Sequence, residues 1–294
     1  GIRTVEELLK VAPDTYEITV FGAEPYGNYN RIMLSPVLAG DKTIDEIMLN
    51  DEQWYVDNGI TLHKGKEVSE IDRVGRKVIA ADGTAEEYDR LLIATGSNPF
   101  IIPVPGHDLD GVVSFRDIHD VDQMLDASKH HKHAVVSGGG LLGLEAANGL
   151  IQQGMSVTVV HIMDTLMERQ LDTPAAEMLR KSLEERGLNF LMGAQTEAII
   201  GKDRVEKLRF KDGTEIYTDL VVMAVGIRPN FALAEKAGIH CERGIVVSDT
   251  MQTFDPRIYA VGECVQHRGV AYGLVAPLFE MARVCANHLA EHGI

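Results

Sequence analysis

The sequence has few cysteines, a shortage of positive charge and no long apolar run. Its 294 residues include three cysteines, Cys241, Cys264 and Cys285. Their wide spacing fits neither a disulfide framework nor a zinc site, and no CxxC redox pair occurs. So sparse a count is typical of the reducing cytoplasm, where we expect the protein to act. No apolar run approaches the roughly 20 residues of a membrane span, so we expect no membrane partner.

Acidic residues dominate the charge. The chain has 44 Asp and Glu against 28 Lys and Arg, and its formal net charge is −16. Such a surface repels nucleic-acid phosphates unless basic residues cluster. The one basic cluster, residues 128–133 (SKHHKH), is short and mostly histidine. We therefore expect no nucleic-acid partner. The length and the 45% hydrophobic content indicate one large or two medium globular domains.

The most informative stretch is HAVVSGGGLLGLEAANGLIQQGMSVTVVH, residues 133–161. An apolar strand over 134–136 leads into a GxGxxG sequence. A helical pattern over 142–151 and a β-branched strand over 157–160 follow. This order of strand, glycine loop, helix and strand turns a weak motif into a specific sign of dinucleotide binding.

Each glycine of this loop has a physical reason. Gly138 permits the tight turn, Gly140 lets the backbone approach a pyrophosphate, and Gly143 lets the helix pack close to the sheet. The helix N-terminus then offers N–H groups and partial positive charge to the phosphates. The fingerprint also expects an acid about 20 residues on, but His161 ends the second strand. Histidine can bond a ribose hydroxyl but does not repel a 2′-phosphate, so NAD versus NADP stays open. A plain strand-end residue is the alternative for His161.

The chain also repeats itself. ADGTAEEYDRLLIATGSNP, from Ala81, aligns without gaps with KDGTEIYTDLVVMAVGIRP, from Lys211. Each copy predicts a hairpin turn at Asp-Gly, then a buried strand that ends in a turn at Gly96 or Gly226. We infer two copies of one α/β nucleotide-binding unit.

The N-terminal sequence fits the same repeat. GIRTVEELLKVAPDTYEITVFG has the pattern of the stretch that begins at Gly143: glycine, amphipathic helix, turn and β-branched strand. Gly1 would then correspond to Gly143. We expect the first strand and two glycines of another GxGxxG, roughly ten residues judged from the motif, to be missing before Gly1.

These motifs resemble the pyridine nucleotide–disulfide oxidoreductases, two-dinucleotide-fold flavoproteins. The resemblance rests on GxGxxGxExA at Gly138, the Ala-Thr-Gly and Ala-Val-Gly turns, GIRPN, and TFDPRIYAVGEC. Within this family, EPYGNYNRIMLSPVLAG and TLMERQLD are most similar to the N-terminal flavoprotein region of NAD(P)H nitrite reductase large subunits. The resemblance implies two Rossmann-like three-layer domains, FAD and NAD(P)H as cofactors, and iron–sulfur and sirohaem groups in the parent protein outside this chain.

The expected domains follow the repeat. An FAD-binding domain would span 1–112 and 247–294, and an NAD(P)-binding domain, 113–246, would be inserted between its two parts. A homodimer stays open, because an interface domain would lie beyond Ile294.

The motifs and the resemblance together predict the cofactor-binding residues. They are Gly1, Glu24, Arg31, Thr95, Gly96, Gly138, Gly140, Leu142, Gly143, Glu145, His161, Gly226, Arg228, Gly262 and Glu263. By resemblance Glu263 stands where the family has an Asp that bonds the ribityl chain of the flavin. Met281 and Phe279, in a helix expected from Val275 to His288, are expected in the core.

Several of these residues have ordinary alternatives. Glu24 is expected either to bind the ribose on the flavin side or to be a surface acid. Arg31 is expected either to bind the diphosphate or to be a solvated loop residue. Thr95, with Gly96, would border the flavin or close an ordinary turn. Glu145 either contributes to the helix dipole or lies near the nicotinamide, and it is the one candidate for a catalytic role.

The sequence is compatible with three functions. The first is an electron-transfer module that passes a hydride from NAD(P)H to FAD and electrons onward to an iron–sulfur or sirohaem acceptor for nitrite reduction. The second is a stand-alone ferredoxin- or rubredoxin-type reductase or an NADH oxidase. The third is a non-catalytic nucleotide-binding or sensor module. The loop NRIMLSPVLAG has no cysteine where the related coenzyme A disulfide reductases have one, so another electron acceptor is expected.

Overall fold

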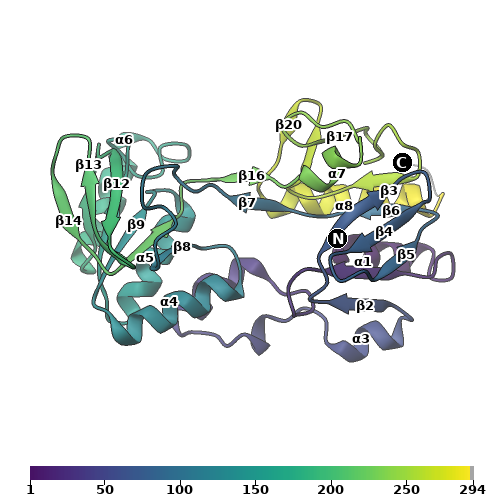
Figure 1. Ribbon diagram of the computed structural model, residues 1–294, viewed down its shortest axis with the longest axis horizontal. Coiled ribbons are helices and arrows are strands. Elements are labelled where there is room, and N and C mark those ends of the chain that lie inside the picture. The colour runs from purple at the N-terminus through teal and green to yellow at the C-terminus, as the bar shows by residue number, and fades with distance from the viewer. Residues whose placement is uncertain (292–294) are drawn as a thin grey trace. The chain divides into compact units, whose positions relative to one another are not determined.

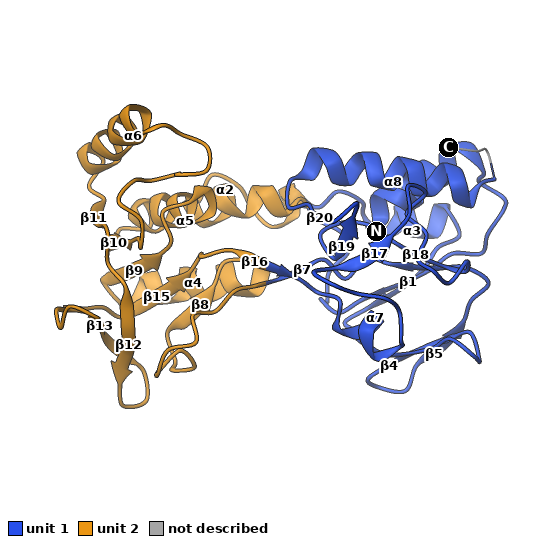
Figure 2. Cartoon of the chain, turned by 90° about the horizontal axis from the view of Figure 1, so that it is seen from above, with its two compact units in different colours: residues 1–29, 48–98, 228–294 blue, residues 30–47, 99–227 orange. Residues whose placement is uncertain are grey.

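The computed structural model describes residues 1–291, and the chain folds into two compact units. Unit 1 comprises residues 1–29, 48–98 and 228 onward, and unit 2 comprises 30–47 and 99–227 (Figure 2). The chain passes from unit 1 to unit 2 after residue 98 and back after residue 227, in each case just after a turn of the repeat, at Gly96 and at Gly226. These unit boundaries precede the domain boundaries expected at 112 and 246. Residues 30–47, expected with the flavin part, belong to unit 2.

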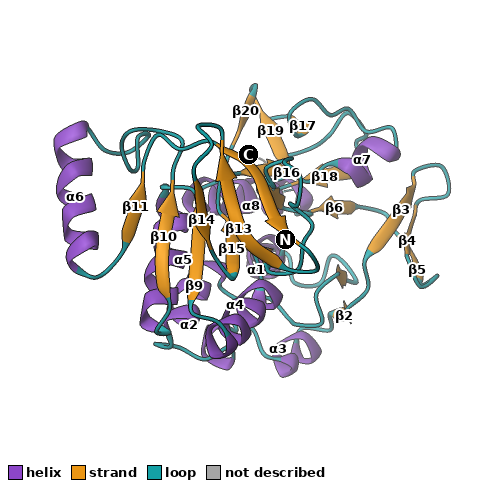
Figure 3. Cartoon of the chain, turned by 60° about the vertical axis from the view of Figure 1, so that its left-hand side comes forward, coloured by secondary structure: helices purple, strands orange, loops and turns teal. Residues whose placement is uncertain are grey.

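Unit 2 is built around a parallel sheet of order β11-β10-β9-β15-β8 (Figure 3). Its strands are β8 (Val112–Ser114), β9 (His133–Ser137), β10 (Ser156–Val160), β11 (Asn189–Leu191) and β15 (Leu220–Met223). An antiparallel sheet contains β12 (Thr196–Gly201), β13 (Val205–Phe210) and β14 (Glu215–Tyr217). The helices are η1 (Arg31–Met33), α2 (Leu34–Ala39), η2 (Asp45–Ile47), α4 (Ile118–His130), α5 (Leu141–Gln152) and α6 (Thr173–Glu185).

The burial pattern explains the three layers of unit 2. The central strand β15 is buried at every position, as expected for a parallel strand covered on both faces. On one face Val135 and Val221 pack with Leu208 and Phe210 of the antiparallel sheet. On the other face α5 packs against β9 and β10, and α2 packs against α5. Leu38 of α2 lies so close to Gly149 that a Cβ there would come within 2.8 Å of it.

Unit 1 has two parallel strand pairs. These are β1 (Thr19–Gly22) with β2 (Thr61–Lys64), and β6 (Leu91–Ile93) with β18 (Ile258–Ala260). Further sheets contain β3 (Val68–Asp72), β4 (Lys77–Ala80) and β5 (Ala85–Glu87), and β17 (Ile245–Val247), β19 (Val265–His267) and β20 (Val270–Ala271). The helices are α1 (Ile2–Val11), α3 (Glu52–Asp57), α7 (Ala232–Lys236) and α8 (Val275–Leu289). Strands β7 (Ser97–Pro99) and β16 (Ile227–Pro229) contain the unit boundaries at 98/99 and 227/228 (Figure 1).

The core of unit 1 joins segments that are distant in sequence. Leu8 of α1, Ile71 of β3, Ile258 of β18 and Cys285 of α8 belong to one buried cluster. Helix α8 has the predicted extent to within one residue, and Met281 is buried as expected. The expectation for Phe279 is wrong, because its side chain is 49% exposed and lies under the Arg3 guanidinium at 5.2 Å. The apolar face of α8 that packs inward does not include this position.

The predicted repeat is confirmed in its hairpins. The Thr84 N–H donates to Asp82 Oδ1 at 2.9 Å, and the Thr214 N–H donates to Asp212 Oδ1 at the same distance. Gly83 and Gly213 both have positive φ, 89° and 86°. The two turns therefore share one backbone conformation, and a parallel strand follows each. Strand β15 is buried at every position as predicted, whereas in β6 only Ile93 is buried.

The two units differ at one strand position. In unit 2, β9 lies between β10 and β15. In the described part of unit 1, the pairs β2-β1 and β6-β18 are not joined by a strand at the corresponding position.

Among the described residues there is no helix with the length and hydropathy needed to cross a bilayer.

Candidate dinucleotide-binding sites

The three glycines of the unit 2 loop have different surroundings. A Cβ at Gly138, where φ is 118°, would lie 2.1 Å from the Ala224 carbonyl oxygen. A Cβ at Gly143 would lie 2.0 Å from the Gly138 carbonyl oxygen. At Gly140 the same Cβ would meet no heavy atom of the described chain within 4 Å. Gly138 and Gly143 are thus required by packing, whereas Gly140 leaves open space beside the backbone.

This open space lies at the start of α5. Gly140 is the N-cap of the helix, and none of the described side chains caps it by a hydrogen bond. Leu142, in the first turn, is 40% exposed. A helix N-terminus offers N–H groups and positive potential to an anion. The contact between Gly138 and Ala224 also brings the glycine loop beside the turn at Gly226, where an added Cβ would again meet no described atom within 4 Å.

His161, at the end of β10, is buried with both ring nitrogens engaged. The Gly139 N–H donates to Nδ1 at 3.0 Å, and Nε2 lies 3.0 Å from Glu168 Oε2. Glu168 was not among the predicted site residues. Partial burial raises the pKa of its carboxyl, but hydrogen bonds from its own N–H and from His161 outweigh this and lower the pKa overall.

Glu145 is held by a residue that the sequence did not indicate. The Ser35 hydroxyl, in α2, donates to Glu145 Oε2 at 2.7 Å. The carboxylate of Glu145 is therefore fixed from a segment 110 residues away in sequence. Neither of its predicted roles includes this contact, and only proximity in the fold reveals it.

In unit 1 the turn after β6 is tied to the GIRPN segment. The Thr95 hydroxyl donates to the Asn230 carbonyl oxygen at 2.5 Å, and the Asn230 N–H donates to the Gly96 carbonyl oxygen at 2.9 Å. Gly96 has φ 68°, which favours glycine. Arg228, two residues before Asn230, is exposed.

The acidic end of the TFDPRIYAVGEC segment lies beside this turn. The Ser97 hydroxyl donates to Glu263 Oε2 at 2.7 Å. Gly262 has φ 90°, and an added Cβ would meet nothing in residues 1–291 within 4 Å. The structure thus places Glu263 close to the Thr95–Gly96 turn, next to an open backbone position.

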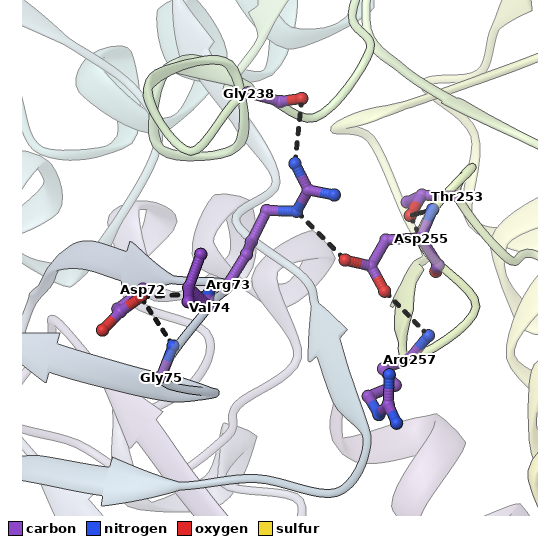
Figure 4. Close-up of polar contacts among 8 residues, drawn as sticks. All are labelled: Asp72, Arg73, Val74, Gly75, Gly238, Thr253, Asp255 and Arg257. Carbon is purple, nitrogen blue, oxygen red and sulfur yellow. Dashed lines mark hydrogen bonds and ion pairs between the residues drawn. The ribbon is translucent and has the colours of Figure 1, made fainter.

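The start of the same segment has a structural role (Figure 4). Arg73 Nε donates to Asp255 Oδ2 at 3.0 Å, and the Arg257 N–H donates to Asp255 Oδ1 at 3.1 Å. The Arg73 guanidinium also lies over the Phe254 ring at 4.7 Å. These contacts fix the turn before β18, which leads to Gly262.

Gly1 and Gly143 have similar surroundings. A Cβ at Gly1 would lie 3.1 Å from Ala94 Cβ, and a Cβ at Gly143 would lie 3.5 Å from Ala224 Cβ. Ala94 and Ala224 are matched positions of the repeat. The start of each helix therefore lies against the alanine that directly follows the equivalent strand of its unit.

The remaining two predicted residues lie in different units. Glu24, in unit 1, accepts a 2.6 Å hydrogen bond from the Tyr29 hydroxyl. Arg31, in unit 2, is exposed and donates to the Arg116 carbonyl oxygen at 3.1 Å. The structure does not bring these two side chains together within one unit.

Unit 2 has an open glycine loop between a parallel strand and a helix, and unit 1 repeats its hairpin and parallel strand; this is the architecture of an α/β nucleotide-binding protein. The chain belongs to the pyridine nucleotide-disulphide oxidoreductase family, whose profile matches residues 1–284. It is 57% identical over 289 residues to a nitrite reductase [NAD(P)H] of Bacillus subtilis, covering 98% of this chain and 36% of the relative. It is 48% identical to an assimilatory nitrate reductase electron transfer subunit of the same species, covering 98% and 38%.

A solved structure shows the same fold. The ferredoxin reductase of Rhodopseudomonas palustris superposes with a TM-score of 0.92 and 28% identity, over 98% of this chain and 73% of that one. The chain spans little more than a third of the length of each of these two curated relatives. The predicted family is therefore confirmed, while the activity of a longer protein is a matter for proposal.

Proposed function

We propose that this chain is the flavoprotein module of an NAD(P)H-dependent nitrite reductase. Bound FAD would supply the redox chemistry, reduction by hydride from NAD(P)H and onward electron transfer, and we propose an iron–sulfur or sirohaem centre as the next acceptor. The observation that carries the proposal is the pair of turns at matched positions of the repeat, Gly96 and Gly226. Open space lies at Gly226 itself and, beside the Gly96 turn, at Gly262. The similarity to the nitrite reductase of Bacillus subtilis supports the choice of acceptor.

The residues fit the two nucleotides by their chemistry. In unit 2, Gly140 and the first N–H groups of α5 would bind the pyrophosphate of NAD(P)H. In unit 1, Gly262 and Glu263 would bind the flavin chain, because a carboxylate accepts hydrogen bonds from ribityl hydroxyls. Glu145, fixed by Ser35, would orient the nicotinamide end. Hydride transfer needs positioning and exclusion of water more than an acid or base, so these residues act by orientation.

Absorbance and reduction test this function. We expect purified protein to bind FAD, shown by its visible spectrum, and the flavin absorbance to bleach when NADH or NADPH is added without oxygen. Reoxidation by a nitrite reductase module, and slow reoxidation by ferredoxin, rubredoxin or oxygen, would support the proposed acceptor. Protein that takes up no FAD and binds no dinucleotide would contradict the proposal and favour a sensor or structural role.

A separate carrier protein is the second candidate acceptor. The likeness to a ferredoxin reductase structure supports it. Rapid reduction of ferredoxin or rubredoxin, with no transfer to an iron–sulfur or sirohaem module, would favour this candidate. Both proposals include a location in the cytoplasm. The three free cysteines support this location, because the cytoplasm is reducing.

We further propose that unit 1 accepts one more parallel strand between β1 and β6. The order of the unit 2 sheet and the matched positions of Gly1 and Gly143 support this strand. Placing residues 133–142 of this chain in front of Gly1 tests it, because these residues precede Gly143 in the repeat. We expect the extended chain to bind FAD more tightly. Equal FAD affinity with and without the extension would contradict the strand.

A further inference from the structure

The ribose end of the unit 2 site has a histidine where the dinucleotide fingerprint expects an acid. His161 uses both ring nitrogens for the protein itself. Because Nδ1 accepts the Gly139 N–H, the neutral ring carries its proton on Nε2 and donates it to Glu168. The His161 side chain is also only 9% exposed. His161 is therefore suited to hold a neighbour in place, and not to contact a sugar directly.

The loop that follows His161 attaches to the phosphate-binding loop at several points. The Met167 N–H donates to the Gly139 carbonyl oxygen at 3.0 Å. A Cβ at Gly139 would come within 2.8 Å of both His161 and Leu166. Met167 has φ 53°, a conformation that redirects the chain just before Glu168. The carboxylate of Glu168 is thus fixed through its side chain to His161 and through its neighbour to Gly139.

The Glu168 side chain keeps contact with solvent. It is 31% exposed, whereas the His161 side chain is 9% exposed. One oxygen, Oε2, faces His161. A carboxylate has about four acceptor sites on its two oxygens, so it can accept further hydrogen bonds from a vicinal diol. A carboxylate at this position would also repel a 2′-phosphate.

We propose that Glu168, positioned by His161, is the acid that binds the adenosine ribose hydroxyls and selects NADH over NADPH. This inference rests on the proposed dinucleotide site at Gly138–Gly143. It places the acid seven residues beyond the usual point, on a loop that returns to the glycine turn. His161 is a positioning residue in this arrangement. The exposed Arg169 next to Glu168 is the nearest cation in sequence, and it would favour a 2′-phosphate if it dominated.

Calorimetric titration with ADP-ribose and 2′-phospho-ADP-ribose tests the inference without flavin or turnover. We expect the unaltered protein to bind ADP-ribose at least about tenfold more tightly than the 2′-phosphorylated form, a difference of about 1.4 kcal/mol. Glu168→Gln, which keeps the shape but removes the charge, should reduce this ratio to below about threefold. Asp164→Asn, an exposed acid of the same loop, is the matched control and should leave the ratio unchanged.

The role of His161 has its own readout. In His161→Ala we expect the discrimination ratio to fall toward that of Glu168→Gln, with native circular dichroism retained. Ring-nitrogen NMR of the unaltered protein should show His161 with Nδ1 unprotonated.

The outcomes separate this inference from the proposed function. If the unaltered protein binds neither ADP-ribose nor its phosphorylated form, the dinucleotide site itself is wrong. If both bind equally, or if Glu168→Gln retains the full ratio, the site stands and the role of Glu168 is refuted. Tighter binding of the phosphorylated form would assign the position to Arg169 instead.

Discussion

Gly143 lies directly against Gly138: a Cβ at Gly143 would be 2.0 Å from the Gly138 carbonyl oxygen. Neither backbone can retreat easily, because Gly138 is itself packed on Ala224. Gly140, between them, has open space on its side-chain side among the described residues. The same loop therefore contains two glycines that packing requires, Gly138 and Gly143, and one, Gly140, that a ligand would require.

Alanine at Gly143 and alanine at Gly140 should affect different properties, the first stability and the second binding. Gly143→Ala should lower the free energy of unfolding by about 3 kcal/mol, because the new methyl group overlaps backbone. Gly140→Ala should lower it by less than about 1 kcal/mol, a helix N-cap effect, yet weaken NADH binding at least about tenfold by filling the pyrophosphate space. Urea unfolding and NADH titration measure the two quantities. Normal NADH affinity in Gly140→Ala would contradict the assignment of this loop.

Glu263 and Ser97 give the corresponding test for the flavin. Glu263→Ala removes the carboxylate and leaves the buried Ser97 hydroxyl without its acceptor. We expect FAD to bind about tenfold more weakly, equivalent to about 1.4 kcal/mol. Glu263→Asp should retain part of the affinity, since the charge stays. Glu280→Ala, an exposed acid on α8, is the control. FAD affinity that is unchanged in Glu263→Ala would exclude this residue from the site.

The Arg73–Asp255 contact predicts a stability effect remote from any cofactor. Both side chains are partly buried, 27% and 15% exposed. Arg73→Ala should lower the free energy of unfolding by about 1 to 2 kcal/mol, through the lost charged hydrogen bond and the lost contact with Phe254. Arg73→Lys should recover less than half, because lysine lacks the planar fork. Arg257→Ala is the control, since its backbone N–H donates to Asp255. Equal unfolding midpoints for Arg73→Ala and Arg257→Ala would refute the prediction.

The local conformations that the sequence predicted depend on residues close together in the chain. The Gly138 loop and the Asp-Gly hairpins are specified by backbone geometry within a few residues, and the structure has both. The Ser35–Glu145 bond joins residues 110 positions apart, and no local pattern could indicate it. Glu168 was missed because the fingerprint directs attention to the strand end, where His161 stands. Phe279 was misplaced because helical periodicity does not show which neighbours cover a face.

The hydrogen bonds to Asp249 predict an acid-sensitive contribution to stability. Hydrogen bonds from Arg268 first, and then from His267, lower the pKa of this exposed carboxyl from 3.8 to about 2. The distances are 2.6 Å from Arg268 Nη2 to Oδ2 and 2.7 Å from His267 Nε2 to Oδ1. Because the folded-state pKa is lowered, the folded state binds fewer protons than the unfolded state in this range. The stabilisation is therefore present above about pH 4 and is lost as pH falls toward 2.

Carboxyl NMR should show Asp249 half-titrated near pH 2, and Arg268→Ala should move that midpoint up toward 3.8. The stability difference between the unaltered protein and Asp249→Asn should shrink over the same interval. A midpoint that does not respond to Arg268→Ala would show that this guanidinium does not hold the carboxylate in solution.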